Sequence, residues 1–419
     1  MTFKELLLHK TILRAVAEIG YDSPTAVQAK AIPVVLAGLD VISSAQTGTG
    51  KTAAFALPIL QKLLKNQSQS VGNKKLIRAL IISPTRELAE QINQDFKKYS
   101  KYTNLRSTVV YGGTSIEPQI DVLKKGVDIL IATPGRLLDL YKREKVKLNN
   151  IETLVLDEAD LMLDMGFIND VNKIVKISNL QKQILLFSAT MPQTVIDLTT
   201  SVLQEPITIK IATTSAAAKN VKQLLYYVPK RKKMELCLHL LRGLTTKKAD
   251  ASKNNILIFR RTKFGVDKLE KTLKRNGYQV STFHGDKTQA ARQEALDKFK
   301  NNKVNILIAT DVASRGIDIT DLDIVINFDL PNIPETYVHR IGRTGRAGKS
   351  GLSYSFCSRD EKSYVKKIQG LLNKAIPVET EHPYPLEKKP DDRPKKRSGS
   401  KYKKGRKSTA SKKKKKRWY

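Results

Sequence analysis

Residues 45–52 carry the side chains most able to do chemistry in the first part of the chain. Glycines in this segment let the backbone approach a phosphate, Lys51 supplies a charge for β- and γ-phosphates, and the Thr52 hydroxyl can reach Mg²⁺. The pattern predicts a nucleoside triphosphate site, although Ala45 replaces the usual first glycine; the alternative is an ordinary glycine-rich turn. The residues expected around the nucleotide are Gln46, Thr47, Gly48, Thr49, Gly50, Lys51 and Thr52.

A second polar segment, residues 157–160, follows the apolar run 151–156 about a hundred residues downstream. Asp157 is the candidate to hold Mg²⁺ through water, and Glu158 is the candidate to polarise the attacking water. The alternative is a solvated helix N-cap, since acidic residues favour that position. Together the two segments predict that the chain binds and hydrolyses a nucleoside triphosphate.

Both polar segments follow apolar strand-like runs. Such runs suit strands covered on both faces, which indicates parallel sheets flanked by helices, an α/β fold with ligands at the strand ends. Helix-length segments separate the runs. The expected strands are 40–44, 79–83, 128–132, 153–156 and 184–188 in the first half, and 255–259, 279–283, 305–309, 324–328 and 352–356 in the second.

Two similar arrays separated by one low-complexity stretch predict two domains of one type. Residues 212–220 are small and polar, which is typical of a flexible linker. The predicted divisions are domain 1 at 1–211, the linker at 212–220, domain 2 at 221–380 and a tail at 381–419. Residues 387–419 hold 17 Lys and Arg against 3 acidic residues. With almost no apolar side chains, this segment is expected to be disordered.

The net charge of +35 predicts a polyanionic partner, with nucleic acid ahead of an anionic membrane surface. The tail contributes +14, so residues 1–386 are basic in their own right at +21. No run approaches the roughly 18 apolar residues of a spanning helix, and the N-terminus does not have the pattern of a signal peptide. Cys237 and Cys357 are too few for a disulfide framework or a four-ligand zinc site. We therefore expect a cytoplasmic protein without a membrane partner.

The segment 157–160 resembles the Asp-Glu-Ala-Asp signature of the DEAD-box RNA helicases, and the resemblance extends over about residues 3–375. Residues 20–28, with Phe3 upstream, resemble the family's Q motif. There the resemblance implies that Gln28 reads the adenine edge through its amide and that Tyr21 packs on the base. Residues 188–190 resemble the motif that couples hydrolysis to RNA binding. Taken alone, these two segments are only a turn into a helix and a strand end.

In the second half, residues 337–346 are dense in basic side chains and glycine. Arg343 and Arg346 lie three apart, so on a helix both would face one way and could grip a γ-phosphate as arginine fingers. The family resemblance implies that role, places His339 in a network linking ATP to RNA, and gives Asp318 a contact with the ribose. The alternative for a lone histidine is a satisfied core residue. The active site is expected to need both domains, which close when ATP and RNA bind together.

Several strand ends carry arginines, hydroxyls and exposed glycine N–H groups, which bind sugar and phosphate rather than base edges. The resemblance implies that these are RNA-backbone contacts, so binding should be sequence-independent and salt-sensitive, with RNA chosen through its 2′-OH. Each segment alone is explained equally well as turn chemistry. The candidate RNA-binding residues are Arg86, Gly113, Thr133, Arg136, Arg292 and Thr310.

The resemblance implies two tandem RecA-like domains and an ATP-dependent RNA helicase that uses Mg²⁺. It would separate short RNA duplexes locally, without translocating, or remodel ribonucleoprotein. The opening residues 2–4 and the short core with a basic tail are most like the bacterial RhlE-type members. A monomer is expected, with ribosomal particles or mRNA-decay machinery as partner classes. Two alternatives stay open: an RNA clamp or annealing chaperone with an incidental ATPase, and a DNA translocase built on the same core.

Overall fold

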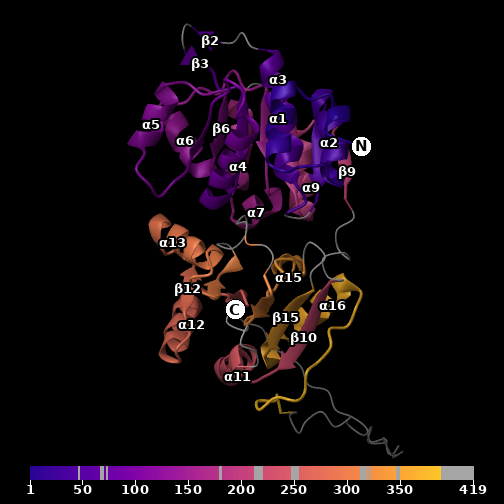
Figure 1. Ribbon diagram of the computed structural model, residues 1–419, viewed down its shortest axis with the longest axis vertical. Helices are drawn as coiled ribbons and strands as arrows, with labels where there is room; N and C mark the ends of the chain where they lie inside the picture. The colour runs from indigo at the N-terminus through magenta and orange to yellow at the C-terminus, as the bar shows by residue number, and fades with distance from the viewer. Residues whose placement is uncertain are drawn as a thin grey trace, which may run out of the picture. The chain divides into compact units, whose positions relative to one another are not determined.

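The computed structural model describes residues 1–45, 48–66, 70–71, 74–178, 182–211, 220–246, 254–311, 319, 322–345 and 350–387. Within this part of the chain, Met1–Pro385 forms one compact unit that contains two large parallel sheets (Figure 1). The predicted linker, except Asn220, and the predicted tail beyond Glu387 lie outside the described residues.

The first sheet has seven parallel strands in the order β5-β6-β4-β7-β8-β1-β9. The strands are β1 (Val41–Ser44), β4 (Ala79–Ile82), β5 (Ser107–Val110), β6 (Ile129–Ala132), β7 (Thr153–Leu156), β8 (Gln183–Ser188) and β9 (Ile207–Lys210). The five expected strands of the first half are confirmed. The two edge strands, β5 and β9, were missed, because a strand exposed along one edge carries polar residues that break the apolar run.

Helices cover both faces of this sheet. They are α1 (Lys10–Glu18), α2 (Ala26–Leu36), α3 (Lys51–Lys65), α4 (Arg86–Tyr99), α5 (Glu117–Lys124), α6 (Pro134–Lys142), α7 (Ala159–Asp164), α8 (Ile168–Ile177) and α9 (Gln193–Val202); a short hairpin pairs β2 (Ser70–Val71) with β3 (Lys74–Lys75). Since neighbouring side chains of a strand point to opposite faces, Ile81 packs in the core with α1–α4. Leu80 packs in the core with α5–α9.

The second sheet has six parallel strands in the order β10-β15-β14-β11-β13-β12. The strands are β10 (Val221–Tyr227), β11 (Ile256–Phe259), β12 (Val280–Phe283), β13 (Ile306–Ala309), β14 (Ile324–Asn327) and β15 (Gly351–Cys357). The helices are α11 (Lys233–Thr246), α12 (Lys263–Arg275), α13 (Gln289–Lys300), α15 (Pro334–Ile341) and α16 (Lys362–Leu372). All five expected strands are present, and the edge strand β10 was missed. The prediction of two α/β parallel-sheet domains is confirmed.

Three helices that follow strands begin at a threonine N-cap. The cap fixes the residue at which the chain turns from the strand into the helix. Thr85 accepts a hydrogen bond from Leu88 N at 3.3 Å, Thr262 from Gly265 N at 3.0 Å and Thr288 from Ala291 N at 3.3 Å. Each cap satisfies an N–H group that the first turn of a helix leaves unpaired. The basic residues Arg86 and Lys263 therefore sit at fixed positions in the first turns of α4 and α12.

In the described part of the chain, no helix has the length and apolar character to cross a membrane. Cys237 and Cys357 are both buried with free thiols. Burial raises the pKa of each thiol to about 12, so neither is reactive near neutral pH.

Candidate functional site

The turn between β1 and α3 is built on glycines. Gly48 has φ +83° and Gly50 has φ +87°, a backbone region that side-chain-bearing residues rarely adopt. A Cβ on Gly50 would lie 2.3 Å from Nε2 of Gln28, so no other residue fits there. Thr52 is the second residue of α3, whose N-terminus favours an anion. Gln46 and Thr47 lie outside the described residues, as do Asp318 and Arg346.

Lys51, at the start of α3, is buried and bonds Oε1 of Glu158 through Nζ at 2.7 Å. Burial lowers the pKa of Lys51, but the carboxylates of Glu158 and Asp157 outweigh burial and the net shift is upward. Lys51 therefore keeps its positive charge inside the protein. The two segments that the sequence pattern singled out meet in the folded chain, as predicted for ends of parallel strands.

Asp157 is buried at the end of β7, and its Oδ1 has no hydrogen-bond partner among the described residues. Burial raises the pKa of Asp157 to about 7; Lys51 opposes the rise and Glu158 adds to it. An unpartnered buried carboxylate oxygen is costly unless a ligand satisfies it. The buried lysine and the helix N-terminus nearby suit phosphates, and the Asp157 carboxylate suits the cation that accompanies them.

Asp160 links this site to the end of β8, a contact that sequence reasoning missed. Its Oδ2 accepts hydrogen bonds from the backbone N (3.0 Å) and Oγ1 (2.6 Å) of Thr190, and its N–H is bonded by Ser188 Oγ at 3.2 Å. Burial raises the pKa of Asp160, but the Thr190 hydrogen bonds and electrostatic interactions, that with His339 among them, give a net lowering. Asp160 thus connects the acidic segment to residues 188–190.

Gln28 contacts the turn between β1 and α3, whereas Tyr21 packs beside Phe3 and Tyr99. The Gln28 amide donates from Nε2 to Gly50 O at 3.2 Å and accepts at Oε1 from Thr25 N at 2.9 Å. A primary amide has one further N–H and one further lone pair, so base reading stays a prediction. Tyr21 is partly exposed, and its ring lies nearly parallel to that of Phe3 with centroids 6.3 Å apart.

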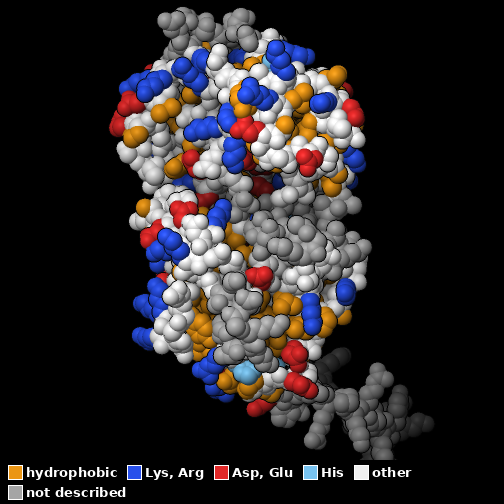
Figure 2. Space-filling model, in the orientation of Figure 1, with side chains coloured by type: hydrophobic (Ala, Val, Ile, Leu, Met, Phe, Trp, Pro, Cys, Tyr) orange, Lys and Arg blue, Asp and Glu red, His pale blue; other side chains and the backbone are white. Residues whose placement is uncertain are grey.

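A cavity of about 1000 Å³ brings together five of the six predicted RNA-binding residues. Those five are Arg86, Thr133, Arg136, Arg292 and Thr310. The sixth, Gly113, is not in the lining, but a Cβ there would fall 2.1 Å from the Arg86 guanidinium. Gly113 therefore leaves room for Arg86. On the face shown in Figure 2, Lys and Arg side chains are distributed with acidic side chains between them. This face has no uniform basic surface, so the candidate RNA site is identified from the residues that line the cavity.

Two arginines in the cavity carry buried donors without hydrogen-bond partners among the described residues. These donors are Nη1 of Arg136 and Nε of Arg292. Arg292 forms an ion pair with Glu87 at 3.0 Å, and Arg136 Nη2 donates to Thr114 O at 2.9 Å. Burial lowers the pKa of both guanidinium groups, yet arginine stays charged in proteins. Unsatisfied cationic donors in one cavity favour an anionic ligand.

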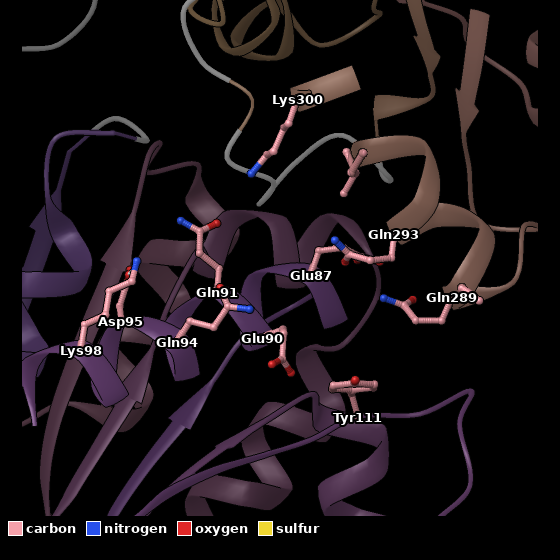
Figure 3. Close-up of a pocket in the computed structure, with 12 residues that line it drawn as sticks. Glu87, Glu90, Gln91, Gln94, Asp95, Lys98, Tyr111, Gln289, Gln293 and Lys300 are labelled. Carbon is pink, nitrogen blue, oxygen red and sulfur yellow. The ribbon is translucent and has the colours of Figure 1, made fainter. Parts of the chain in front are cut away.

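A second pocket, of about 410 Å³, has a different character (Figure 3). Its polar lining is mainly carboxylates and primary amides, together with two lysines. The carboxylates are Glu87, Glu90 and Asp95, and the amides are Gln91, Gln94, Gln289 and Gln293. Its three carboxylates outnumber its two lysines. The larger cavity instead sets five Arg and Lys side chains against three carboxylates, Glu87, Asp139 and Asp286, so the arginine-lined cavity is the better site for nucleic acid.

Helix α15 ends at Ile341, which corrects one prediction. Arg343 lies past the end of this helix, because Gly342 caps it and the chain turns toward Leu322, whose N–H donates to Arg343 O at 3.2 Å. Arg343 is buried, and His339 is half-buried on α15. Their predicted roles in catalysis stay predictions.

Arg340, between these two residues, was missed. Its guanidinium bonds both oxygens of Asp311, at 2.5 and 2.7 Å, and also Asn327 Oδ1 (3.1 Å) and Asp329 O (2.7 Å). These contacts tie α15 to the ends of β13 and β14. No spacing in the sequence indicates them, because the partners lie at the ends of two separate strands.

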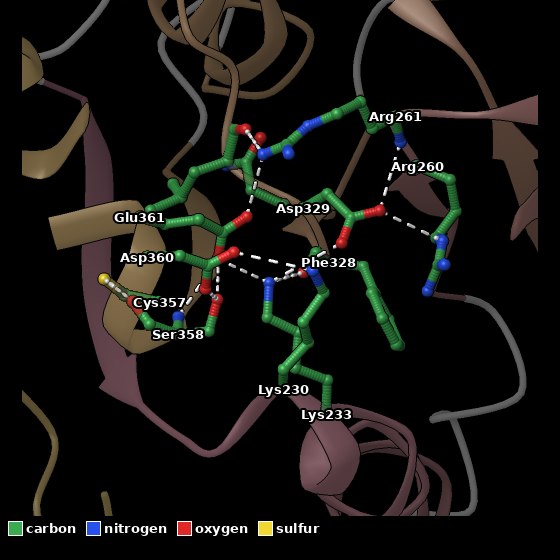
Figure 4. Close-up of polar contacts among 12 residues, drawn as sticks. Lys230, Lys233, Arg260, Arg261, Phe328, Asp329, Cys357, Ser358, Asp360 and Glu361 are labelled. Carbon is green, nitrogen blue, oxygen red and sulfur yellow. Dashed lines mark hydrogen bonds and ion pairs between the residues drawn. The ribbon is translucent and has the colours of Figure 1, made fainter. Parts of the chain in front are cut away.

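A buried charge network holds the strand end after β11 (Figure 4). Glu361 accepts from Lys233 Nζ at 2.6 Å and from Arg261 Nη2 at 2.9 Å. Asp329 accepts from the Arg261 N–H at 3.1 Å and pairs with Arg260 at 3.2 Å. Because Arg261 also lines the large cavity, the network sets the position of one cationic wall.

Two family profiles match the chain: DEAD/DEAH box helicase over residues 25–198, and Helicase conserved C-terminal domain over residues 232–348. The chain is 42% identical over 368 residues to the DEAD-box ATP-dependent RNA helicase CshA of Bacillus cereus, covering 88% of this chain and 67% of that relative. It is 42% identical over 375 residues to the DEAD-box ATP-dependent RNA helicase RhpA of Helicobacter pylori, covering 90% and 73%.

Two solved structures resemble the whole two-sheet unit. Mss116p bound to ssRNA and AMP-PNP superposes with a TM-score of 0.82 at 30% identity, covering 91% of this chain and 78% of that one. Dbp5 of S. cerevisiae bound to RNA and ADP BeF3 superposes with a TM-score of 0.77 at 29% identity, covering 90% and 95%.

Proposed function

Because the chain belongs to the DEAD-box family of ATP-dependent RNA helicases, we propose that it opens short RNA duplexes locally or remodels ribonucleoprotein, without translocating. It has two RecA-like domains and uses ATP. The observation that carries the proposal is the cavity lined by Arg86, Arg136 and Arg292. This cavity lies in the same compact unit as the buried Lys51–Glu158 pair. For the domain limits we propose 1–211 and 221–380, with the linker and the tail as predicted from the sequence.

The ATP site assigns a role to each buried charge. Lys51 would bind the β- and γ-phosphates, which compete with Glu158 for its ammonium group. Once released from Lys51, the Glu158 carboxylate can accept a hydrogen bond from the attacking water and draw off its proton. Arg343, with Arg346, would stabilise charge on the γ-phosphate. Gln28 and Tyr21 would bind the adenine.

For the metal we propose Mg²⁺, held by Thr52 and Asp157. Asp157 Oδ1 is buried and lacks a hydrogen-bond partner among the described residues, which fits a ligand oxygen. No cluster of three His, Cys, Asp or Glu side chains occurs within the described ranges, and Mg²⁺ ordinarily takes one or two carboxylates plus substrate phosphates. When bound, Mg²⁺ would neutralise charge on those phosphates.

Asp160 supplies a route by which RNA could stimulate hydrolysis. It accepts a hydrogen bond from Thr190 directly, and electrostatic interaction with His339 lowers its pKa, which supports a link between a strand end of the first sheet and helix α15. Binding of RNA across both sheets would favour the arrangement in which these residues meet, and ATP would favour it too. His339 therefore acts in the coupling rather than on the phosphate.

We keep five finer assignments as proposals from the sequence. RNA is contacted through its backbone, and the protein acts as a monomer. The partners are ribosomal particles or mRNA-decay machinery. The opening residues 2–4 and the basic tail favour a RhlE-type relationship. The cytoplasm fits the two buried free cysteines, Cys237 and Cys357.

The ATPase measured with three nucleic acids tests the proposal. We expect single-stranded RNA to stimulate phosphate release strongly and single-stranded DNA of the same sequence to stimulate it weakly, and a short RNA duplex to separate only with ATP. Equal stimulation by DNA would favour a DNA translocase. Strand separation without nucleotide would favour an annealing chaperone or clamp.

Gly113→Ala should lower RNA affinity about tenfold or more. The new Cβ would lie 2.1–2.3 Å from the Arg86 guanidinium, which must move away and lose a phosphate contact worth about 1.5–3 kcal/mol. The positive φ of +74° adds about 1–2 kcal/mol of backbone strain, so affinity is measured by fluorescence anisotropy at a temperature where the variant is folded.

Gly277→Ala is the matched control, since Gly277 also has a positive φ of +83°, a Cβ there meets nothing within 4 Å, and Gly277 is not in the cavity lining. It should bind RNA as the unmodified protein does. Equal losses in the two variants would show that Arg86 placement is not the cause.

Removing residues 387–419 should weaken RNA binding at low salt and flatten its salt dependence. The segment carries a net charge of +14, and each neutralised phosphate of a single strand contributes about −0.7 to the slope of log K against log salt. The maximal ATPase at saturating RNA should stay nearly unchanged. Unchanged affinity at low salt would leave the tail with a solubilising role only.

A further inference from the structure

Phe264 is the most exposed of the described Phe, Tyr and Trp side chains. It is the second residue of α12, and 79% of its surface is accessible. Helix α12 packs on the sheet through Val266, Leu269 and Leu273, so Phe264 contributes nothing to the core. Covering an exposed phenyl ring is favourable in water. Contact with a ligand would therefore stabilise this side chain.

The ring lies at the wall of the arginine-lined cavity. On its own sheet, its neighbours in that wall are Arg261, Lys263 and Thr310. Gly285 also lines the wall and has only the Lys263 side chain near its Cβ position, with Cε at 3.5 Å. Lys263 Nζ is paired with Asp286 at 2.5 Å, which fixes the first turn of α12 where Phe264 projects. Half-buried Met165 and Phe167 add apolar surface to the same cavity.

Cations and an exposed aromatic face in one cavity match the two parts of a nucleotide. Guanidinium groups bind phosphate, and a flat apolar ring stacks on a base, whatever its identity. A ligand with phosphates alone would leave Phe264 in water, and an apolar ligand would leave the buried donors of Arg136 and Arg292 unsatisfied.

We propose that Phe264 stacks on one base of the bound RNA strand. The inference rests on the proposed RNA-binding function and extends it from backbone contacts to a base contact. It adds affinity without sequence choice, because every base has a stacking face. A base that leaves its neighbours to stack on Phe264 cannot keep its place in a regular duplex, so the contact also favours the separated strand.

The test uses a single-stranded RNA in which one nucleotide at a time is abasic, with affinity measured by anisotropy. The affinity of the unmodified protein for the strand should fall about 5- to 150-fold when the abasic nucleotide is at one particular position. Phe264→Ala should bind the intact strand more weakly by the same factor and be insensitive to the abasic site at that position. Phe264→Trp should restore both the affinity and the position-dependent loss, and Phe264→Leu should restore neither.

Val122→Ala, a truncation of another exposed apolar residue (40% accessible) on α5, is the control and should change nothing. The inference is overturned if Phe264→Ala binds the intact strand normally, if its position-dependent loss persists, or if Leu rescues fully. If the unmodified protein fails to bind any of the strands, the proposed RNA-binding function fails instead.

Discussion

Glu158→Gln should lower RNA-stimulated ATP hydrolysis by about 10²- to 10⁴-fold, the usual contribution of a positioned general base. Glutamine keeps the shape of the side chain but cannot draw a proton from the attacking water. Lys51 loses its partner at 2.7 Å and becomes more available to phosphate, so ATP affinity should hold or rise. Phosphate release at saturating RNA measures the first effect, and binding of a fluorescent ATP analogue measures the second.

The control is Glu117→Gln, which changes an exposed carboxylate at the start of α5 and should leave turnover unchanged. If Glu158→Gln hydrolyses ATP at the normal rate, Glu158 is not the base. If it separates RNA strands at the normal rate while hydrolysis is lost, the reaction is not driven by turnover, and the clamp or chaperone alternative is favoured.

The interior of the fold could be predicted from the sequence because interior strands are buried on both faces. The runs that became β6 and β13 are apolar throughout and fully buried. Strand β9 is different, since three of its four residues are exposed. It lies at the edge of the sheet, where only one strand, β1, pairs with it and helices cover less of its surface. Its four residues are too few for alternating hydrophobic and polar side chains to identify it as a strand.

The strand ends that bear chemistry were predictable for a related reason. Lys51 and Glu158 each follow a buried parallel strand, and such ends meet at one edge of a sheet. Partners within the edge were not predictable, because pairs such as Asp160 with Thr190 or Glu361 with Lys233 depend on the paths of loops and helix starts. The same limit explains the error at Arg343, where helical spacing was extended past the cap at Gly342.

Arg340→Met should destabilise the protein by about 3 kcal/mol and also reduce RNA-stimulated ATP hydrolysis. Arg340 is 2% exposed and bonds both oxygens of Asp311, so its loss removes a two-pronged buried ion pair. Removing one partner of a buried ion pair usually costs about 3–5 kcal/mol. The low end applies because Asp311 keeps 25% of its side-chain surface exposed. Urea unfolding followed by fluorescence measures the stability.

The activity loss has a separate cause, since Arg340 holds α15, the helix that carries His339 and leads into Arg343. Arg340→Lys keeps the charge but not the two-pronged contact, so it should recover part of the stability and little of the activity. Arg143→Met, which breaks an exposed pair with Asp139, should shift stability by less than about 0.5 kcal/mol. If Arg340→Met unfolds at the same urea concentration as the unmodified protein, the contacts at Asp311, Asn327 and Asp329 do not fix α15. The placement of His339 would then need another explanation.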